Sequence, residues 1–325
     1  MPFLACVQTK LELDAYISAQ AFEAWILSQA KRALETRDSG EAALVAFPEL
    51  IGLPLLFLLN RSVMTNKVQD AALELARESW LEALFHGVQY RNFSASSFIL
   101  PRAMLLFRVF TNAFATAAKE TNSFIVAGSN FLPGVELEAA RGLHLADGRV
   151  QNVSFLFTPS GKILLRASKL NLTAGLEQRV GLTRGRLEDM GAAVTPLGKV
   201  ATLICYDGFF ERALEKADSL GAQIIVQPSA NAAQWNGAWS ADKTKIEGQE
   251  WLARGITQGI QGRVNIGYAL NPMMVGNLFD LEFEGRSSIS ANQSVIDAKT
   301  PILSIASSHT DFEIVTSRVP DFQVF

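Results

Sequence analysis

A cysteine follows a short apolar run in the second half of this chain. The run Val200–Ile204 leads into Cys205, and Tyr206, Asp207 and Gly208 then end the apolar pattern. Short apolar runs bounded by turn residues are typical of strands that are buried on both faces. The carboxyl ends of such strands carry the chemistry in open α/β sheets. Cys205 is therefore a candidate nucleophile; the alternative is a small buried hydrophobic residue, as most free cysteines are.

A nucleophilic cysteine needs a neighbouring base, because the thiolate is the reactive form and a free cysteine is mostly thiol at neutral pH. Histidine is the usual base, but His86, His144 and His309 all lie away from the ends of predicted strands. We interpret these three as surface residues or as histidines with structural hydrogen bonds. The base for Cys205 is therefore expected to be a carboxylate.

Two charged residues follow other predicted strands. Glu49 comes after the apolar run at 42–47, and Lys169 comes after the run at 162–165. A charge at the end of a buried strand is unfavourable unless it is paired or functional. A carboxylate can take the thiol proton, and an ammonium group favours both the thiolate and a developing oxyanion. We predict that these two residues and Cys205 meet in one site, whereas a solvated rim charge is the alternative for each alone.

The elements that would position these residues alternate along the chain. Apolar runs predict strands at 3–7, 42–47, 124–127, 153–157, 162–165, 200–204, 223–227 and 264–270, and short tail strands at 287–290, 294–296 and 302–305. Helical spacing of apolar residues predicts helices at 15–35, 68–84, 210–220 and 238–260. This alternation indicates a layered α/β protein, and we predict a single domain over residues 1–325.

One unusually apolar segment, Ala95–Ala118, carries only Arg102 and Arg108 as charged residues. We favour a helix buried against the body of the protein or against a partner subunit. A lid over the site and docking on a membrane surface are alternatives, although the basic polar face that favours membrane docking is missing. No apolar run reaches the roughly 18–20 residues needed to span a bilayer, so no integral membrane segment is expected.

Four stretches around the candidate residues resemble the nitrilase superfamily of carbon–nitrogen hydrolases. They are Phe47–Leu50, Lys169–Leu172, Ile204–Asp207 and Pro228–Asn231, the last followed by Trp235. The segment Glu282–Ser288 is similar to a late glycine–x–serine element of the family, and the likeness covers nearly the whole chain. Each motif alone is weak evidence, but four in the same order are fairly specific.

The resemblance implies a four-layer α-β-β-α sandwich that usually assembles into homodimers or larger oligomers. Glu49 would be the general base, Lys169 would stabilise the oxyanion and Cys205 would form a thioester, without a metal or a cofactor. The family's second glutamate would be Glu177, soon after Lys169. A loop carboxylate is the alternative for that residue.

The resemblance also suggests three substrate-binding residues, namely Tyr206, Asn231 and Trp235. The expected reaction is hydrolysis of a linear amide to a carboxylic acid and ammonia or an amine. Nitrile hydrolysis and N-carbamoyl hydrolysis on the same scaffold are alternatives. An acyltransferase is disfavoured because the spanning helices of that branch are missing, and a catalytically silent interaction subunit is the alternative from another class.

The chain departs from the family in two places. Phe209 stands where many amidase-type members carry arginine, which disfavours amides derived from small dicarboxylates. The connection from Glu49 to Gly128 is longer than is typical, which indicates an apolar insertion around 60–120. If this insertion covers the pocket, a hydrophobic or bulky acyl group would be favoured. Tyr206, where nitrilases carry tryptophan, modestly favours the amidase-type branch.

The composition argues against several other functions. The chain has 29 lysines and arginines against 32 aspartates and glutamates, so it lacks the basic excess of a nucleic-acid-binding protein. The two cysteines, Cys6 and Cys205, do not form a disulfide framework. The N-terminal residues lack the pattern of a signal peptide, so we expect a cytoplasmic location. The expected partner is a small-molecule amide or nitrile.

Overall fold

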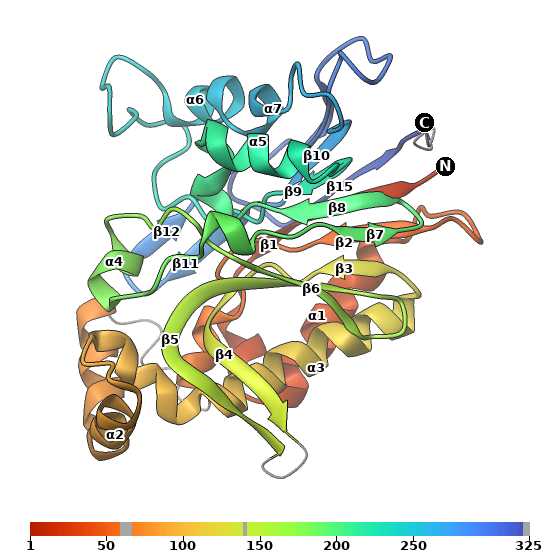
Figure 1. The fold of residues 1–325 in the computed structure, drawn as a ribbon. Coiled ribbons are helices and arrows are strands. Elements are labelled where there is room, and N and C mark those ends of the chain that lie inside the picture. The colour runs from red at the N-terminus through yellow and green to blue at the C-terminus, as the bar shows by residue number, and fades with distance from the viewer. Residues whose placement is uncertain (59–66, 139–141, 321–325) are drawn as a thin grey trace.

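The computed structural model describes residues 1–58, 67–138 and 142–320, which form four layers (Figure 1). Two β-sheets face each other, and helices cover the outer face of each sheet. The α-β-β-α sandwich that the resemblance implied is thereby confirmed. The extent of the single domain and the boundaries of the proposed insertion stay predictions, and residues 59–66 of that insertion lie outside the described part.

The larger sheet has nine strands among the described residues, in the order β12-β11-β1-β2-β3-β5-β4, with β15 beside β1 and β6 beside β5. Its strands are β1 (Phe3–Lys10), β2 (Ala43–Ala46), β3 (Phe124–Val126), β4 (Asn130–Glu138), β5 (Gly142–Phe157), β6 (Ile163–Ser168), β11 (Met274–Leu278), β12 (Leu281–Phe283) and β15 (Glu313–Arg318). The three strands β1, β2 and β3 are parallel. Their carboxyl ends therefore lie at one edge of the sheet, where Glu49 follows β2.

The smaller sheet has six strands among the described residues, in the order β14-β13-β10-β9-β8-β7. They are β7 (Ala193–Thr195), β8 (Gly198–Thr202), β9 (Ile224–Val226), β10 (Tyr268–Asn271), β13 (Ser288–Ala291) and β14 (Ile302–Ile305). The central strands β8, β9 and β10 are parallel and fully or largely buried. Burial on both faces explains why the sequence of such strands is continuously apolar.

The helices divide between the two outer faces. They are α1 (Ala19–Ala33), α2 (Val68–Tyr90), α3 (Ala103–Thr121), α4 (Leu176–Val180), α5 (Glu211–Ser219), α6 (Glu247–Arg254) and α7 (Ile256–Gly259). Helices α1 and α3 lie on the outer face of the larger sheet, whereas α5, α6 and α7 lie on that of the smaller sheet (Figure 1). Short 3-10 helices occupy Leu13–Tyr16, Leu53–Phe57, Ala95–Arg102, Leu187–Asp189 and Cys205–Phe209.

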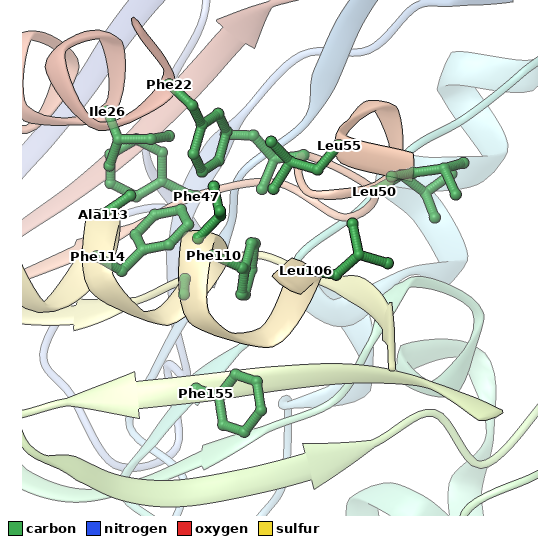
Figure 2. Packing of buried hydrophobic residues seen from close by; sticks show 14 of the residues in the cluster. Phe22, Ile26, Phe47, Leu50, Leu55, Leu106, Phe110, Ala113, Phe114 and Phe155 are labelled. Carbon is green, nitrogen blue, oxygen red and sulfur yellow. The ribbon is translucent and has the colours of Figure 1, made fainter. Parts of the chain in front are cut away.

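An aromatic layer fills the space between α1, α3 and the larger sheet (Figure 2). The ring of Phe114 lies 6.3 Å from that of Phe22 on α1, 5.2 Å from that of Phe47 after β2, and 5.0 Å from that of Phe110 one turn away on α3. All three pairs are edge-on, which is a favoured geometry for aromatic rings. The apolar segment at 95–118 is therefore in large part a helix buried in this core, as favoured from the sequence.

Within the described residues, one helical stretch, Ala95–Thr121, is long and apolar enough to cross a membrane by length and composition. Half of its most apolar part is buried inside the protein, and buried core helices satisfy the same criterion. Its contacts with α1 and the larger sheet account for its apolar composition.

Several elements differ from the sequence-based expectation. The helix expected over 238–260 begins only at Glu247, because residues 238–246 form a loop in which Ala238 pairs with Ile246. Residues 294–296 form a turn held by Asn292 rather than a strand. The strands β4, β7, β11, β12 and β15 were not predicted. These strands carry polar residues and are exposed in part, so a continuous apolar run does not mark them.

Candidate active site

Cys205 opens the 3-10 helix that follows β8, three residues beyond the end of the strand. Its φ angle of 50° lies in the left-handed region, which residues other than glycine rarely occupy. Backbone strain of this kind persists only where the surroundings enforce it, and it clusters at functional sites. The Cys205 N–H donates to the Pro228 carbonyl at 2.8 Å, and the Cys205 carbonyl accepts from Gln227 Nε2 at 2.6 Å. Both flanking peptide groups are thus fixed by the loop after β9.

Gly208 makes room for this support. A Cβ atom at position 208 would lie 2.3 Å from Gln227 Nε2, so a larger residue would displace the amide that holds the Cys205 carbonyl. The glycine that ends the apolar run in the sequence therefore contributes to the position of the thiol.

Glu49 lies in the turn after β2, and the loop after β3 supports this turn. The Leu50 N–H donates to Ser129 Oγ at 3.0 Å, and Leu50 has a left-handed φ of 62°. Gly128 also has a left-handed φ, and a Cβ atom there would lie 2.0 Å from the Pro48 carbonyl oxygen. Close packing of two adjacent loops thus fixes the direction of the Glu49 side chain.

Lys169 follows β6 and lies between two carboxylates. Its Nζ donates to Glu49 Oε1 at 2.7 Å and to Glu177 Oε2 at 2.9 Å. The side chains of all three residues are at most 4% exposed. Glu177, on the short helix α4, also accepts from the N–H and Oγ1 of Thr173 at 2.9 and 3.0 Å. The structure therefore places Glu177 with the other predicted residues rather than on an exposed loop.

Asn152, on β5, connects the two carboxylates and was not predicted from the sequence. Its Nδ2 donates to Glu49 Oε1 at 2.8 Å and to Glu177 Oε1 at 2.7 Å, and the residue is fully buried. Its carbonyl accepts from the Lys169 N–H at 2.9 Å. The only sequence signal is a polar residue next to the apolar run at 153–157.

Asp207 is a second residue whose importance the sequence did not reveal. Its buried carboxylate accepts from the N–H of Leu170 at 3.0 Å and from the N–H and Nδ2 of Asn171 at 2.7 and 3.0 Å. These bonds connect the turn that carries Cys205 to the loop that follows Lys169. Burial raises the pKa of Asp207 to about 6, and the donated hydrogen bonds oppose the rise.

The electrostatics of the cluster favour a neutral thiol at rest. Burial raises the pKa of Cys205, and the neighbouring Glu49 carboxylate raises it further. Burial also raises the pKa of Glu49, although the Lys169 charge opposes this. For Lys169, burial lowers the pKa, but the surrounding negative groups outweigh it and hold the pKa above its ordinary value. A carboxylate with a raised pKa beside a thiol is suited to accept its proton during reaction.

A cavity of about 520 Å³ opens above this cluster. Glu49, Lys169, Glu177 and Cys205 all line it, as do two of the expected substrate-binding residues, Tyr206 and Asn231. Tyr206 is partly exposed at its rim. The Asn231 amide donates to the carbonyls of Ala233 and Glu284, so it also holds the cavity wall together.

Trp235 does not line the cavity, contrary to the expectation. Its buried ring packs on Gly248, where a Cβ atom would lie 2.4 Å from Trp235 Cε2. Two tryptophans that were not predicted, Trp239 and Trp251, line the cavity instead.

The apolar insertion does not cover the site either. No residue of 67–121 lines the cavity, so the lid interpretation of Ala95–Ala118 is wrong for the part of the insertion that the structure describes. None of the three histidines lines the cavity. Among the described residues, no group of three or more histidine, cysteine, aspartate or glutamate side chains is arranged to hold a metal ion.

A two-sheet sandwich that brings a cysteine, a lysine and two glutamates together in one cavity is suited to nucleophilic catalysis by the cysteine. Residues 3–267 match the family model described as carbon-nitrogen hydrolase. The chain belongs to this family, which is part of the nitrilase superfamily, whose members act on small amides and nitriles.

Solved structures of this superfamily share the fold. The amidase from Nesterenkonia sp. AN1, in a variant where acrylamide has added to the active-site cysteine, matches with a TM-score of 0.63 and 15% identity over 98% of this chain and 94% of its own. A complex of the same amidase with butyramide gives 0.62 and 15% over 98% and 90%. A carbon-nitrogen hydrolase from Helicobacter pylori G27 gives 0.63 and 15% over 97% and 87%. At this identity the likeness concerns the fold alone.

Proposed function

We propose that this protein is a cysteine-dependent amidase that hydrolyses a linear amide to a carboxylic acid and ammonia or an amine. The observation that carries the proposal is the position of Lys169 between the Glu49 and Glu177 carboxylates, in the cavity that Cys205 lines. In a buried ionic cluster of this kind, the attraction between the charges rarely exceeds the free-energy penalty of removing them from water. Its retention next to a strained cysteine is better explained by chemistry.

In the first half of the reaction, Glu49 takes the proton from Cys205 Sγ and the thiolate attacks the amide carbonyl carbon. The negative charge moves to the carbonyl oxygen of the tetrahedral intermediate. An ammonium group has three donors, and two of those on Lys169 are directed at Glu49 and Glu177. The third donor and the backbone N–H of Tyr206 are proposed to stabilise the oxyanion.

In the second half, the proton on Glu49 passes to the nitrogen of the substrate as the carbon–nitrogen bond breaks. Ammonia or an amine leaves, and the acyl group remains on Cys205 as a thioester. Glu49 then takes a proton from a water molecule, whose oxygen attacks the thioester and releases the acid. The proton returns to Sγ, and the enzyme is regenerated. Glu177 and Asn152 act through Glu49 and Lys169 and are positioning residues.

The residues that line the cavity favour a substrate amide without a carboxylate group. Phe209 lines the cavity where many amidase-type relatives carry arginine, and most of the remaining lining is apolar. A nitrile is the second candidate, since the same thiolate would attack its carbon, and an N-carbamoyl compound is the third. Assembly into a homo-oligomer and a cytoplasmic location stay predictions that depend on the resemblance and on the composition.

An ammonia-release screen over amides, nitriles and N-carbamoyl compounds tests this proposal. We expect the wild-type protein to release ammonia from amides, and the Cys205→Ala variant to lose at least about 10⁴-fold of kcat/KM. The control is Cys6→Ala, because Cys6 is buried between the two sheets and does not line the cavity. This variant should keep its activity. A folded wild-type protein that releases no ammonia from any of the three classes, and whose Cys205 resists thiol reagents, would instead be a silent subunit.

A further inference from the structure

Part of the cavity wall is chemically distinct from the catalytic cluster. Four aromatic rings, those of Tyr206, Phe209, Trp239 and Trp251, line it together with the carboxylates of Glu247 and Glu250 on α6. The Phe209 ring lies 4.9 Å from the Trp251 ring and 6.1 Å from the Tyr206 ring. Apart from Lys169, whose ammonium is held by two glutamates, no lysine or arginine of the described chain lines the cavity.

The two carboxylates on this wall differ in their partners. Glu250 is paired with Lys245 at 3.3 Å and with Arg254 at 3.6 Å. Both of these cations lie over the ring of Trp239, at 5.6 and 5.0 Å, and neither lines the cavity. The negative charge of Glu250 is therefore compensated by the protein itself.

Glu247 is compensated more weakly, by a backbone hydrogen bond from Ser240 and by the charge of Lys243, which makes no ion pair with it. Glu247 is only 6% exposed, and its Oε1 accepts one hydrogen bond from Trp251 Nε1 at 3.1 Å. Among the described residues, no lysine or arginine nitrogen lies within 4 Å of its carboxylate. The N-terminal turn of α6 and the charge of Lys243 offset part of the negative charge, but a buried carboxylate without an ion-pair partner is unfavourable. Burial accordingly raises its pKa.

We propose that this wall binds a cationic group of the substrate, a primary ammonium or a guanidinium, with Glu247 as the ion-pair partner and the aromatic rings as the surface for the rest of the chain. Aromatic faces attract cations and also pack well on methylene groups. The catalytic cluster adds a further net negative charge, because the single ammonium group of Lys169 is paired with two glutamates. The inference rests on the proposed function and narrows it to linear amides with a cation at the end remote from the scissile bond.

The first test compares ω-aminoalkanamides that have two to six methylene groups with neutral alkanamides of equal length. At the length that fits the cavity, we expect kcat/KM to be at least about 10-fold higher for the cationic amide, through a lower KM. Glu247→Gln should reduce this ratio to near one, whereas Glu215→Gln, an exposed residue on α5, should leave the ratio unchanged. A preference for neutral or anionic amides, or a ratio that Glu247→Gln does not alter, overturns the inference while leaving the amidase proposal intact.

The second test does not depend on catalysis. Binding of n-pentylammonium and of 1-pentanol to the Cys205→Ala variant is measured by calorimetry. We expect the ammonium compound to bind at least about 10-fold more tightly, and Glu247→Gln to abolish the difference. Equal binding of the two compounds overturns the inference whatever the screen of amides shows. If no amide is hydrolysed but the ammonium compound binds through Glu247, the proposed reaction fails and the cation site stands.

Discussion

Phe47 and Glu49 are two residues apart in the same turn and lie in opposite environments. The ring of Phe47 belongs to the aromatic layer between α1 and α3, 5.2 Å from that of Phe114 (Figure 2). The carboxylate of Glu49 belongs to the ionic cluster, 2.7 Å from Lys169 Nζ. Both side chains are buried. The fold thus buries an apolar group on one side of this turn and charges on the other, and the two kinds of burial have opposite energetic consequences.

Burial of the aromatic ring removes apolar surface from water and stabilises the fold by roughly 25 cal/mol per Å². Burial of an ion has the opposite sign, since the desolvation penalty amounts to several kcal/mol per ion even after relaxation. In the ionic cluster, hydrogen bonds from Asn152 and Thr173 supplement the two bonds from Lys169 and offset part of that penalty. The comparison indicates that the aromatic layer accounts for stability, whereas the ionic cluster is costly to bury and fits the chemistry proposed for it.

Removal of the ammonium group gives the largest expected effect. In Lys169→Met, the Glu49 and Glu177 carboxylates face each other without a cation, so we expect a loss of about 3–5 kcal/mol in the free energy of unfolding. Amide hydrolysis should fall by at least about 10³-fold, because a donor to the oxyanion is lost. Urea unfolding and kcat/KM measure the two effects.

The double variant Lys169→Met/Glu177→Gln separates stability from chemistry at this position. Since one buried carboxylate is then neutral, part of the lost stability should return while the activity stays absent. Recovery of activity in the double variant, or unchanged stability in the single variant, would contradict the division between the two regions.

Truncation in the aromatic layer should lower stability to a similar extent but leave activity nearly unchanged. Phe114→Ala removes a ring that contacts four other rings and leaves a cavity, so we expect a loss of about 3–5 kcal/mol in the free energy of unfolding. The folded fraction should keep a kcat within about threefold of wild type, because Phe114 does not line the active-site cavity. The control is Phe93→Ala, a residue 76% exposed, for which a change below about 0.5 kcal/mol is expected. A folded Phe114→Ala protein without activity would show that the two regions are coupled.

The sequence predicted the ionic cluster better than its surroundings. Glu49, Lys169 and Cys205 follow apolar runs, so strand patterns suggested that they meet, and the family resemblance supplied their roles and added Glu177. Asn152 escaped prediction because its contribution depends on the antiparallel pairing of β5 with β6, a long-range register that local patterns do not specify. Asp207 was seen only as a turn residue, since its partners lie in the loop after Lys169.

The wall of the cavity was predicted least well. Trp235 was chosen from the family resemblance, whereas Trp239 and Trp251 were assigned to one long helix that the structure does not contain. The chain at 238–246 is a loop instead, and this loop turns the ring of Trp239 towards the cavity. Loop conformation follows from tertiary contacts such as the pairing of Ala238 with Ile246, which leave no periodic signal in the sequence.

The smallest expected effect concerns Asp207, a buried charge that forms no ion pair within the described part of the chain. Its titration tests directly whether burial of a charge in this region lowers stability. Its pKa is about 6 in the folded protein against 3.8 for an ordinary aspartate. A carboxyl group whose pKa is raised by folding binds its proton more tightly in the folded state. Its unfavourable contribution is therefore absent below about pH 4, grows as the pH rises towards 6 and is constant above that, with a total of about 3 kcal/mol.

Asp207→Asn removes this titration and also replaces one acceptor oxygen with a donor, a loss that does not depend on pH. We therefore expect the free energy of unfolding of the wild type, relative to that of Asp207→Asn, to fall by up to about 3 kcal/mol between pH 4 and pH 6 and then to stay level. Urea unfolding at closely spaced pH values measures this difference. Asp189→Asn, an exposed residue, serves as the control and should follow the wild type at each pH. If the stability of the wild type relative to Asp207→Asn instead rises with pH, the hydrogen bonds from Leu170 and Asn171 outweigh the cost of burying the carboxylate. Asp207 would then be a stabilising residue, like those of the aromatic layer, rather than a charge retained for chemistry.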